Sequence, residues 1–121
     1  MRDVIEKELA FSVDVIRDGH EVVPRFHIDT PDGAFVVLCP LPDDINVRFA
    51  RMELVSKFMA SKLATRFVMS SELMEPDAVS AIGVTRTDTL AGVRLITRKP
   101  LAFGDVQWLG SDQVGVSSGY V

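Results

Sequence analysis

The feature that most constrains the fold is a helical segment, residues 43–66, that is apolar on two sides. At 100° per residue, one apolar stripe and a second stripe nearly opposite it are separated by seams of charged side chains. The first stripe consists of Ile45, Phe49, Met52, Val55, Met59 and Leu63, and the second of Val47, Ala50, Leu54 and Phe58. A surface helix needs only one apolar stripe, which faces its own core. This segment therefore has to be covered twice, by its own fold or by another molecule.

The two stripes are expected to have different partners. The Ile45–Leu63 stripe runs the whole length of the segment, so it should face the chain's own sheet. The Val47–Phe58 stripe gives way to polar residues, so its contact should be confined to the first three or four turns. A second copy of the chain is one candidate for that contact. The other is internal cover, by residues 1–9, by the segment around Trp108, or by strands that curl around the helix.

Before this helix the pattern predicts three strands. Alternating apolar and polar residues over 11–15 and a second run over 21–30 each match a strand, with turn signals after both. The third run, Ala34–Cys39, is apolar on both faces and is expected at the centre of the sheet. A short helical turn at the N-terminus is an open alternative, because Asp3 and Glu6 have the spacing of a capping box.

After the helix the pattern predicts three more strands, over residues 67–74, 78–86 and 92–99. Short connections favour antiparallel neighbours. The predicted class is α+β, with an antiparallel sheet of about six strands in the order βββ-α-βββ packed around one long helix. Residues 1–109 are expected to form a single domain. Residues 110–121 are rich in glycine and serine and are expected to be a mobile tail.

Composition indicates a small intracellular protein with a large core. A chain of 121 residues forms one domain without disulfides or metals, and 47% of its residues are hydrophobic. Such a content is expected when surface is also buried between subunits. Cys39 is the only cysteine, which favours a reducing compartment. No signal peptide or membrane-spanning run is present, so a cytoplasmic protein that does not enter the membrane is expected.

The charge is unevenly distributed along the chain. The net charge is −4, and residues 1–44 carry four basic and ten acidic side chains, whereas residues 45–99 carry nine basic and five acidic. The basic side chains of the last hairpin are Arg86, Arg94, Arg98 and Lys99. The first three are candidate anion-binding residues, but two solvated surfaces of opposite sign are the preferred interpretation of the pattern. Nucleic-acid modules interleave such a patch with exposed aromatic side chains, and none is evident here, so a nucleic-acid partner is not expected.

Motifs for metals, cofactors and nucleophilic catalysis are absent from the sequence. His20 and His27 differ by an odd number, so on one strand they would point to opposite faces, and metal ligation is not expected. Two carboxylates stand at the helix start, where a phosphate would need backbone amides, so no nucleotide cofactor is expected. Ser70 and Ser71 lack the glycines of a nucleophile elbow and are interpreted as polar strand residues.

The carboxylates at the helix start, Asp43 and Asp44, have two interpretations. A carboxylate at the start of a helix packed on an antiparallel sheet resembles the hot-dog-fold thioesterases and dehydratases. The resemblance implies acyl-group chemistry, with Asp44 as acid/base or nucleophile and Asn46 polarising a carbonyl. It covers only the helix start, and three strands before the helix are more than the usual pattern has. Helix capping and the helix dipole explain both aspartates without catalysis.

The leading hypothesis is a non-enzymatic protein that forms a dimer or higher homo-oligomer. Its interface residues would be Val47, Ala50, Leu54 and Phe58. One alternative is a small apolar-ligand binder, with a pocket between helix and sheet lined by methionines. These are Met52, Met59, Met69 and Met74. The other alternative is the acyl-group enzyme that the resemblance implies.

Overall fold

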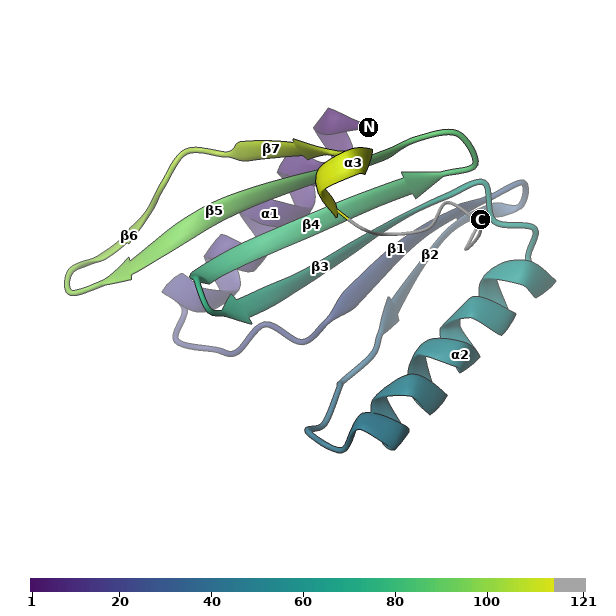
Figure 1. Cartoon of the computed structure of the whole chain (residues 1–121), viewed down its shortest axis with the longest axis horizontal. Coiled ribbons are helices and arrows are strands. Elements are labelled where there is room, and N and C mark those ends of the chain that lie inside the picture. The colour runs from purple at the N-terminus through teal and green to yellow at the C-terminus, as the bar shows by residue number, and fades with distance from the viewer. Residues whose placement is uncertain (115–121) are drawn as a thin grey trace.

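Within residues 1–114, which the computed structural model describes, seven strands form one antiparallel sheet (Figure 1). In chain order the elements are α1 (Arg2–Arg17), β1 (Arg25–Thr30), β2 (Gly33–Leu38), α2 (Ile45–Ser61), β3 (Arg66–Met74), β4 (Asp77–Thr85), β5 (Thr89–Arg98), β6 (Leu101–Phe103), β7 (Gln107–Gly110) and α3 (Ser111–Val114). The strands lie in the order β2-β1-β3-β4-β5, and β6 and β7 pair with opposite ends of β5. The predicted α+β class with an antiparallel sheet is confirmed.

Helix α1 covers one face of the sheet across β3, β4 and β5. Its buried apolar residues recur every three or four positions, which places them on one side of a helix. They are Ile5, Leu9, Val13 and Ile16, and they pack on Val68, Val79, Ala81 and Ile96. Gly92 on β5 lies directly beneath this helix, because a Cβ atom there would be 2.9 Å from Ile5 Cγ2 and 3.1 Å from Leu9 Cδ1. The close packing of α1 therefore depends on a glycine at this position.

Helix α2 packs on the opposite face, at the β2 end of the sheet (Figure 1). Two of its side chains, Val55 and Met59, are buried in a second core. The other buried members of this core are Phe26, Ile28, Cys39, Ala64, Phe67 and Val84. Because successive strand residues alternate between faces, Phe67 contacts the α2 core while Val68 contacts the α1 core.

The order of elements before α2 differs from the prediction. Residues 11–15 belong to helix α1 and not to a strand, so two long helices contribute to the fold instead of one. The apolar alternation of Phe11, Val13 and Val15 matches a strand, but the spacing of Ile5 to Ile16 matches a helix over a longer stretch. The longer pattern prevails because it buries a continuous stripe against the sheet.

The third predicted strand is present at the expected place in the chain, but its predicted position at the centre of the sheet is wrong. Strand β2 pairs only with β1 among the described strands, so it lies at the edge and not at the centre. Its residues Val36 and Leu38 point to the face that carries α1, but they are 52% and 61% exposed because α1 does not extend over them. A strand that is apolar on both faces is therefore left partly uncovered.

Other local predictions agree with the structure. The turn at 30–33 is closed by Thr30, whose Oγ1 donates to the Gly33 carbonyl at 2.8 Å and accepts from the Asp32 amide at 3.2 Å. Strands β3, β4 and β5 lie within one to three residues of the predicted bounds. Of the predicted tail, Gly110 ends β7, residues 111–114 form α3, and residues 115–121 lie outside the described residues. None of the described helices is long and apolar enough to cross a membrane.

Candidate functional site

The strongest candidate site is the solvent-facing side of helix α2. Four large apolar side chains of α2, and a fifth two residues beyond its end, are between 39% and 72% exposed. They are Ile45, Val47, Phe49, Leu54 and Leu63. Val47 and Leu54, together with the exposed Ala50, belong to the second stripe and are called here the outer face of α2, whereas Ile45, Phe49 and Leu63 lie on the first stripe, on nearly the opposite side. Monomeric proteins rarely leave so many large apolar side chains together in water, so such a surface indicates a contact with another molecule.

The stripe that was predicted to face the sheet does so only in its middle. Val55 and Met59 are buried, whereas Ile45, Phe49 and Leu63 are more than 60% exposed. Strand β2 is the last of the described strands on this side, and the sheet leaves these three side chains uncovered. The prediction that this stripe is covered by the chain's own sheet along its whole length is therefore wrong.

The second stripe also divides into two parts. Val47, Ala50 and Leu54 are exposed, as a contact with another molecule would require. Phe58 is half-buried, with its ring edge-on to Phe35 at a centroid distance of 5.5 Å. Three of the four predicted interface residues therefore lie on the free surface, and Phe58 contributes to the core.

A groove separates the outer face of α2 from the edge strand β2. It has a volume of about 360 Å³ and is lined by Val37, Leu38, Cys39, Pro40, Arg51, Leu54 and Val55. Arg51 Nη1 donates to the Pro40 carbonyl, which ties the middle of α2 to the end of β2. Edge strands are usually protected by charges or proline, but Gly33–Leu38 contains neither. The exposed apolar surface thus adjoins an edge without the usual protection.

At the start of α2, Asp44 acts as the helix cap. Its Oδ1 accepts hydrogen bonds from the Asn46 amide at 2.9 Å and the Val47 amide at 3.2 Å. This is the geometry by which an aspartate satisfies the free amides of a first helical turn. Capping by Asp44, as preferred from the sequence, is confirmed. The side chains of Asp44 and Asn46 lie on the exposed part of the helix.

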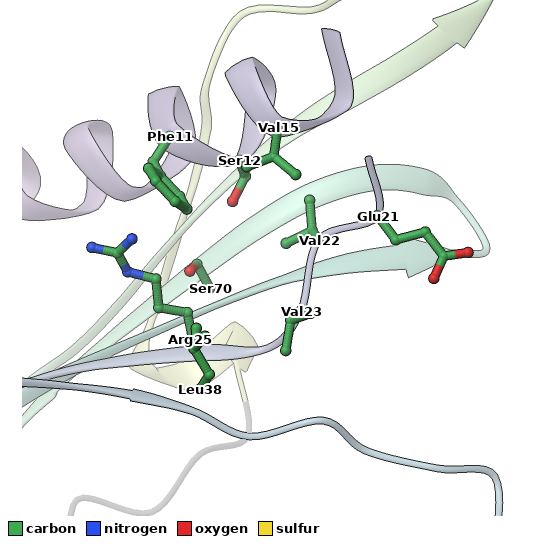
Figure 2. Close-up of a pocket in the computed structure, with 9 residues that line it drawn as sticks. All are labelled: Phe11, Ser12, Val15, Glu21, Val22, Val23, Arg25, Leu38 and Ser70. Carbon is green, nitrogen blue, oxygen red and sulfur yellow. The ribbon is translucent and has the colours of Figure 1, made fainter. Parts of the chain in front are cut away.

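The methionines of the predicted ligand pocket do not share one pocket wall. Met59 is buried in the α2 core, Met52 and Met69 pack at its margin, and Met74 is exposed at the far end of β3. A cavity is found instead between α1 and strands β1, β2 and β3 (Figure 2). Its walls come from segments that are far apart in the sequence, and no local motif marks them.

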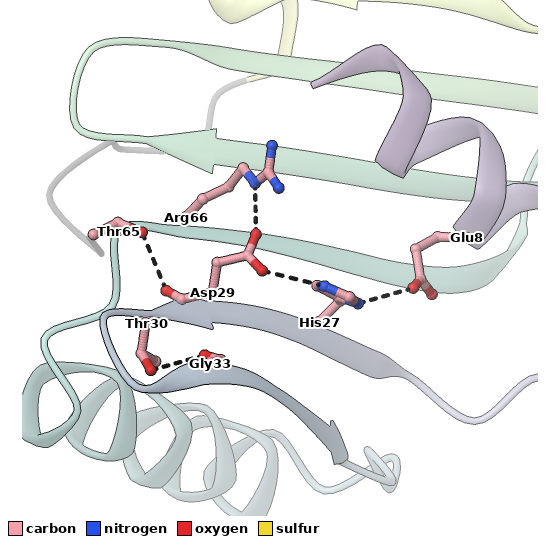
Figure 3. Close-up of polar contacts among 7 residues, drawn as sticks. All are labelled: Glu8, His27, Asp29, Thr30, Gly33, Thr65 and Arg66. Atoms are coloured by element: carbon pink, nitrogen blue, oxygen red, sulfur yellow. Dashed lines mark hydrogen bonds and ion pairs between the residues drawn. The ribbon is translucent and has the colours of Figure 1, made fainter.

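A row of charged side chains runs from Glu8 of α1 along β1 to Arg66 of β3 (Figure 3). Glu8 of α1 is buried, and its carboxylate lies 3.2 Å from Arg25 Nε and 3.5 Å from His27 Nδ1. His27 Nε2 lies 3.4 Å from Asp29, which accepts a hydrogen bond of 2.7 Å from Arg66 Nε. The alternation of side chains along β1 places Arg25, His27 and Asp29 on one face, but no local pattern marks their partner Glu8. No cluster of three metal-binding side chains occurs among residues 1–114.

The three candidate anion-binding arginines are spread over β5 and its neighbours. Arg98 donates to Asp77 at 2.8 Å and to Glu72 at 3.0 Å, and its hydrogen bond holds the pKa of Asp77 below the usual range. Arg94 Nε donates to the Gly104 carbonyl at 2.7 Å. Arg86 follows β4, near the other end of β5, which at about 3.3 Å per residue is roughly 30 Å long. The structure therefore does not gather these arginines into one patch.

Comparisons with family models, with curated proteins and with solved structures gave no match. The geometry of the chain itself, above all the exposed apolar surface of α2, is what indicates a function.

Proposed function

We propose that the protein is a non-enzymatic interaction domain that forms a homodimer through the outer face of α2. The observation that carries this proposal is the exposure of five large apolar side chains around one helix. At 150–200 Å² for a large side chain, they expose on the order of 500 Å². The area is divided between two nearly opposite sides of α2, so the side with Val47 and Leu54 supplies only part of the roughly 800 Å² that each partner buries in a standard interface.

A second copy of the same chain is the partner that this surface fits best. Most soluble homo-oligomers use a twofold interface, in which one patch meets the same patch of the other copy. Ala50 is the small residue at the centre of the outer face, with Val47 three residues before it and Leu54 four residues after it. In an antiparallel pair centred near Ala50, Val47 of one copy faces Leu54 of the other, and the alanines allow a close approach of the helices.

The mass of the unmodified protein in solution tests this proposal. Sedimentation over concentrations from about 1 to about 100 µM should show the mass rising from the 13.3 kDa of one chain toward twice that value. The rise is expected because dimers form by mass action. A mass that stays at one chain throughout the range would refute the proposal.

A further inference from the structure

The cavity beneath α1 has the features of a small-molecule site and is separate from the outer face of α2. It holds about 170 Å³ and is lined by Phe11, Ser12 and Val15 of α1, by Glu21, Val22 and Val23 of the following segment, and by Arg25, Leu38 and Ser70 (Figure 2). Most of these side chains are apolar. Arg25 pairs with Leu38 on one side and with Ser70 on the other, so these three residues form one row across the sheet.

Two serine hydroxyls in the cavity wall are without hydrogen-bond partners. Ser12 and Ser70 are fully buried, and neither Oγ finds a partner among residues 1–114. Figure 2 shows them on opposite sides of the cavity, one on the helix and one on the sheet. A buried hydroxyl that makes no hydrogen bond costs free energy, so native proteins usually supply a partner, which is often a water molecule or a ligand.

The cavity is connected to the surface through a mostly apolar opening. Phe11, Val23 and Leu38 are partly exposed around it. The Arg25 guanidinium lies 4.1 Å from the centre of the Phe11 ring, which holds that ring at one side of the opening. A small molecule can therefore enter without displacing α1.

We propose that this cavity binds a small uncharged molecule with an apolar body and one hydrogen-bonding oxygen. Its size follows from volume, because an apolar cavity of about 150 Å³ accommodates benzene, so that roughly seven non-hydrogen atoms fit here. Its oxygen would complete the hydrogen bonds of Ser12 and Ser70. The positive charge of Arg25 is balanced by the buried Glu8, whose Oε2 lies 3.2 Å from Arg25 Nε although the two atoms form no hydrogen bond, so the cavity wall favours an uncharged molecule over an anion.

Titration with three small probes, followed by NMR of the amide groups, tests the proposal. Phenol, toluene and pentanoate each have seven non-hydrogen atoms, but only phenol combines an uncharged ring with a hydroxyl. Phenol should produce saturable shifts around Ser12, Val22 and Ser70, with a Kd near 1 mM or below, which a ligand of this size can reach. Toluene should bind about fivefold to tenfold more weakly, and pentanoate more weakly still.

Substitutions within the cavity separate this site from any other binding. Ser70→Ala should weaken phenol binding about fivefold to tenfold, and filling the cavity by Val22→Phe should abolish it. Ser71→Ala is the matched control, because Ser71 lies on the same strand but faces the other side, where its Oγ is 3.4 Å from Ser80 Oγ. It should leave the Kd unchanged.

Three results would overturn the proposal. The first is a set of shifts that do not saturate, as expected for a cavity that holds only water. The second is an equal affinity of the Ser70→Ala and Ser71→Ala proteins for phenol. The third is tighter binding of pentanoate than of phenol or toluene.

Discussion

Replacing Gly92 by valine should lower the free energy of unfolding by about 3 kcal/mol or more, a large fraction of the 5–15 kcal/mol typical of a domain. Even a Cβ atom at this position would lie 2.9 Å from Ile5 Cγ2 and 3.2 Å from Val106 Cγ1. Both neighbours are held in the α1 core, so the added atoms force the helix away from the sheet. Urea unfolding followed by circular dichroism would measure the loss.

A graded comparison of two glycines serves as the control. At Gly104 the nearest atoms to an added Cβ are 3.7–3.9 Å away, in ordinary contact. Gly104→Ala should therefore change the stability by less than about 0.5 kcal/mol, whereas Gly92→Ala should cost about 1–2 kcal/mol. If Gly92→Val were as stable as the unmodified protein, α1 would not pack on β5 as described.

Replacing Leu54 by aspartate should convert the proposed dimer into a folded monomer. Leu54 is 66% exposed in one chain, so the substitution leaves the core intact and should change the stability of the monomer by no more than about 0.5 kcal/mol. In the dimer, each of the two leucines loses about 1.5–3 kcal/mol of apolar burial, and a carboxylate enters the interface. The dissociation constant of the proposed dimer should therefore rise about a hundredfold or more. Light scattering on a sizing column would measure the change.

Met74→Asp provides the matched control for Leu54→Asp. Met74 is an exposed apolar residue at the end of β3, away from α2, so this variant should keep the mass of the unmodified protein. Phe58→Asp is a less suitable probe, because Phe58 packs against Phe35 within one chain. A Leu54→Asp protein that dimerises as well as the Met74→Asp protein would place the interface elsewhere.

The parts of the fold that sequence patterns predicted are those that depend on local chemistry. The cap by Asp44, the turn closed by Thr30 and the strands after α2 each follow from residues close together in the chain. Helix α1 was missed because Val13 belongs both to a short alternating run and to the longer helical series that begins at Ile5. The alternating run over residues 11–15 predicted a strand in place of the helix because it left out residues 1–9, where the helical series begins.

The parts that could not be predicted depend on how far one element extends over another. The apolar sequence of β2 predicts a strand at the centre of the sheet, and only the strand order shows that β2 lies at the edge. The same order leaves Phe49 exposed, although it belongs to the stripe that contains the buried Val55. In the cavity, Ser12 and Ser70 are 58 positions apart in the sequence, so their proximity is a property of tertiary packing alone.

A cross-link between two copies of α2 would test most directly whether the outer face of one copy contacts that of another. The lone cysteine is first removed by Cys39→Ala, and one new cysteine is introduced by Ala50→Cys at the centre of the outer face. A short bismaleimide should then join two chains in high yield, whereas Met74→Cys in the same background should give little covalent dimer. Equal yields from the two positions, or no product from Ala50→Cys, would contradict the proposed interface.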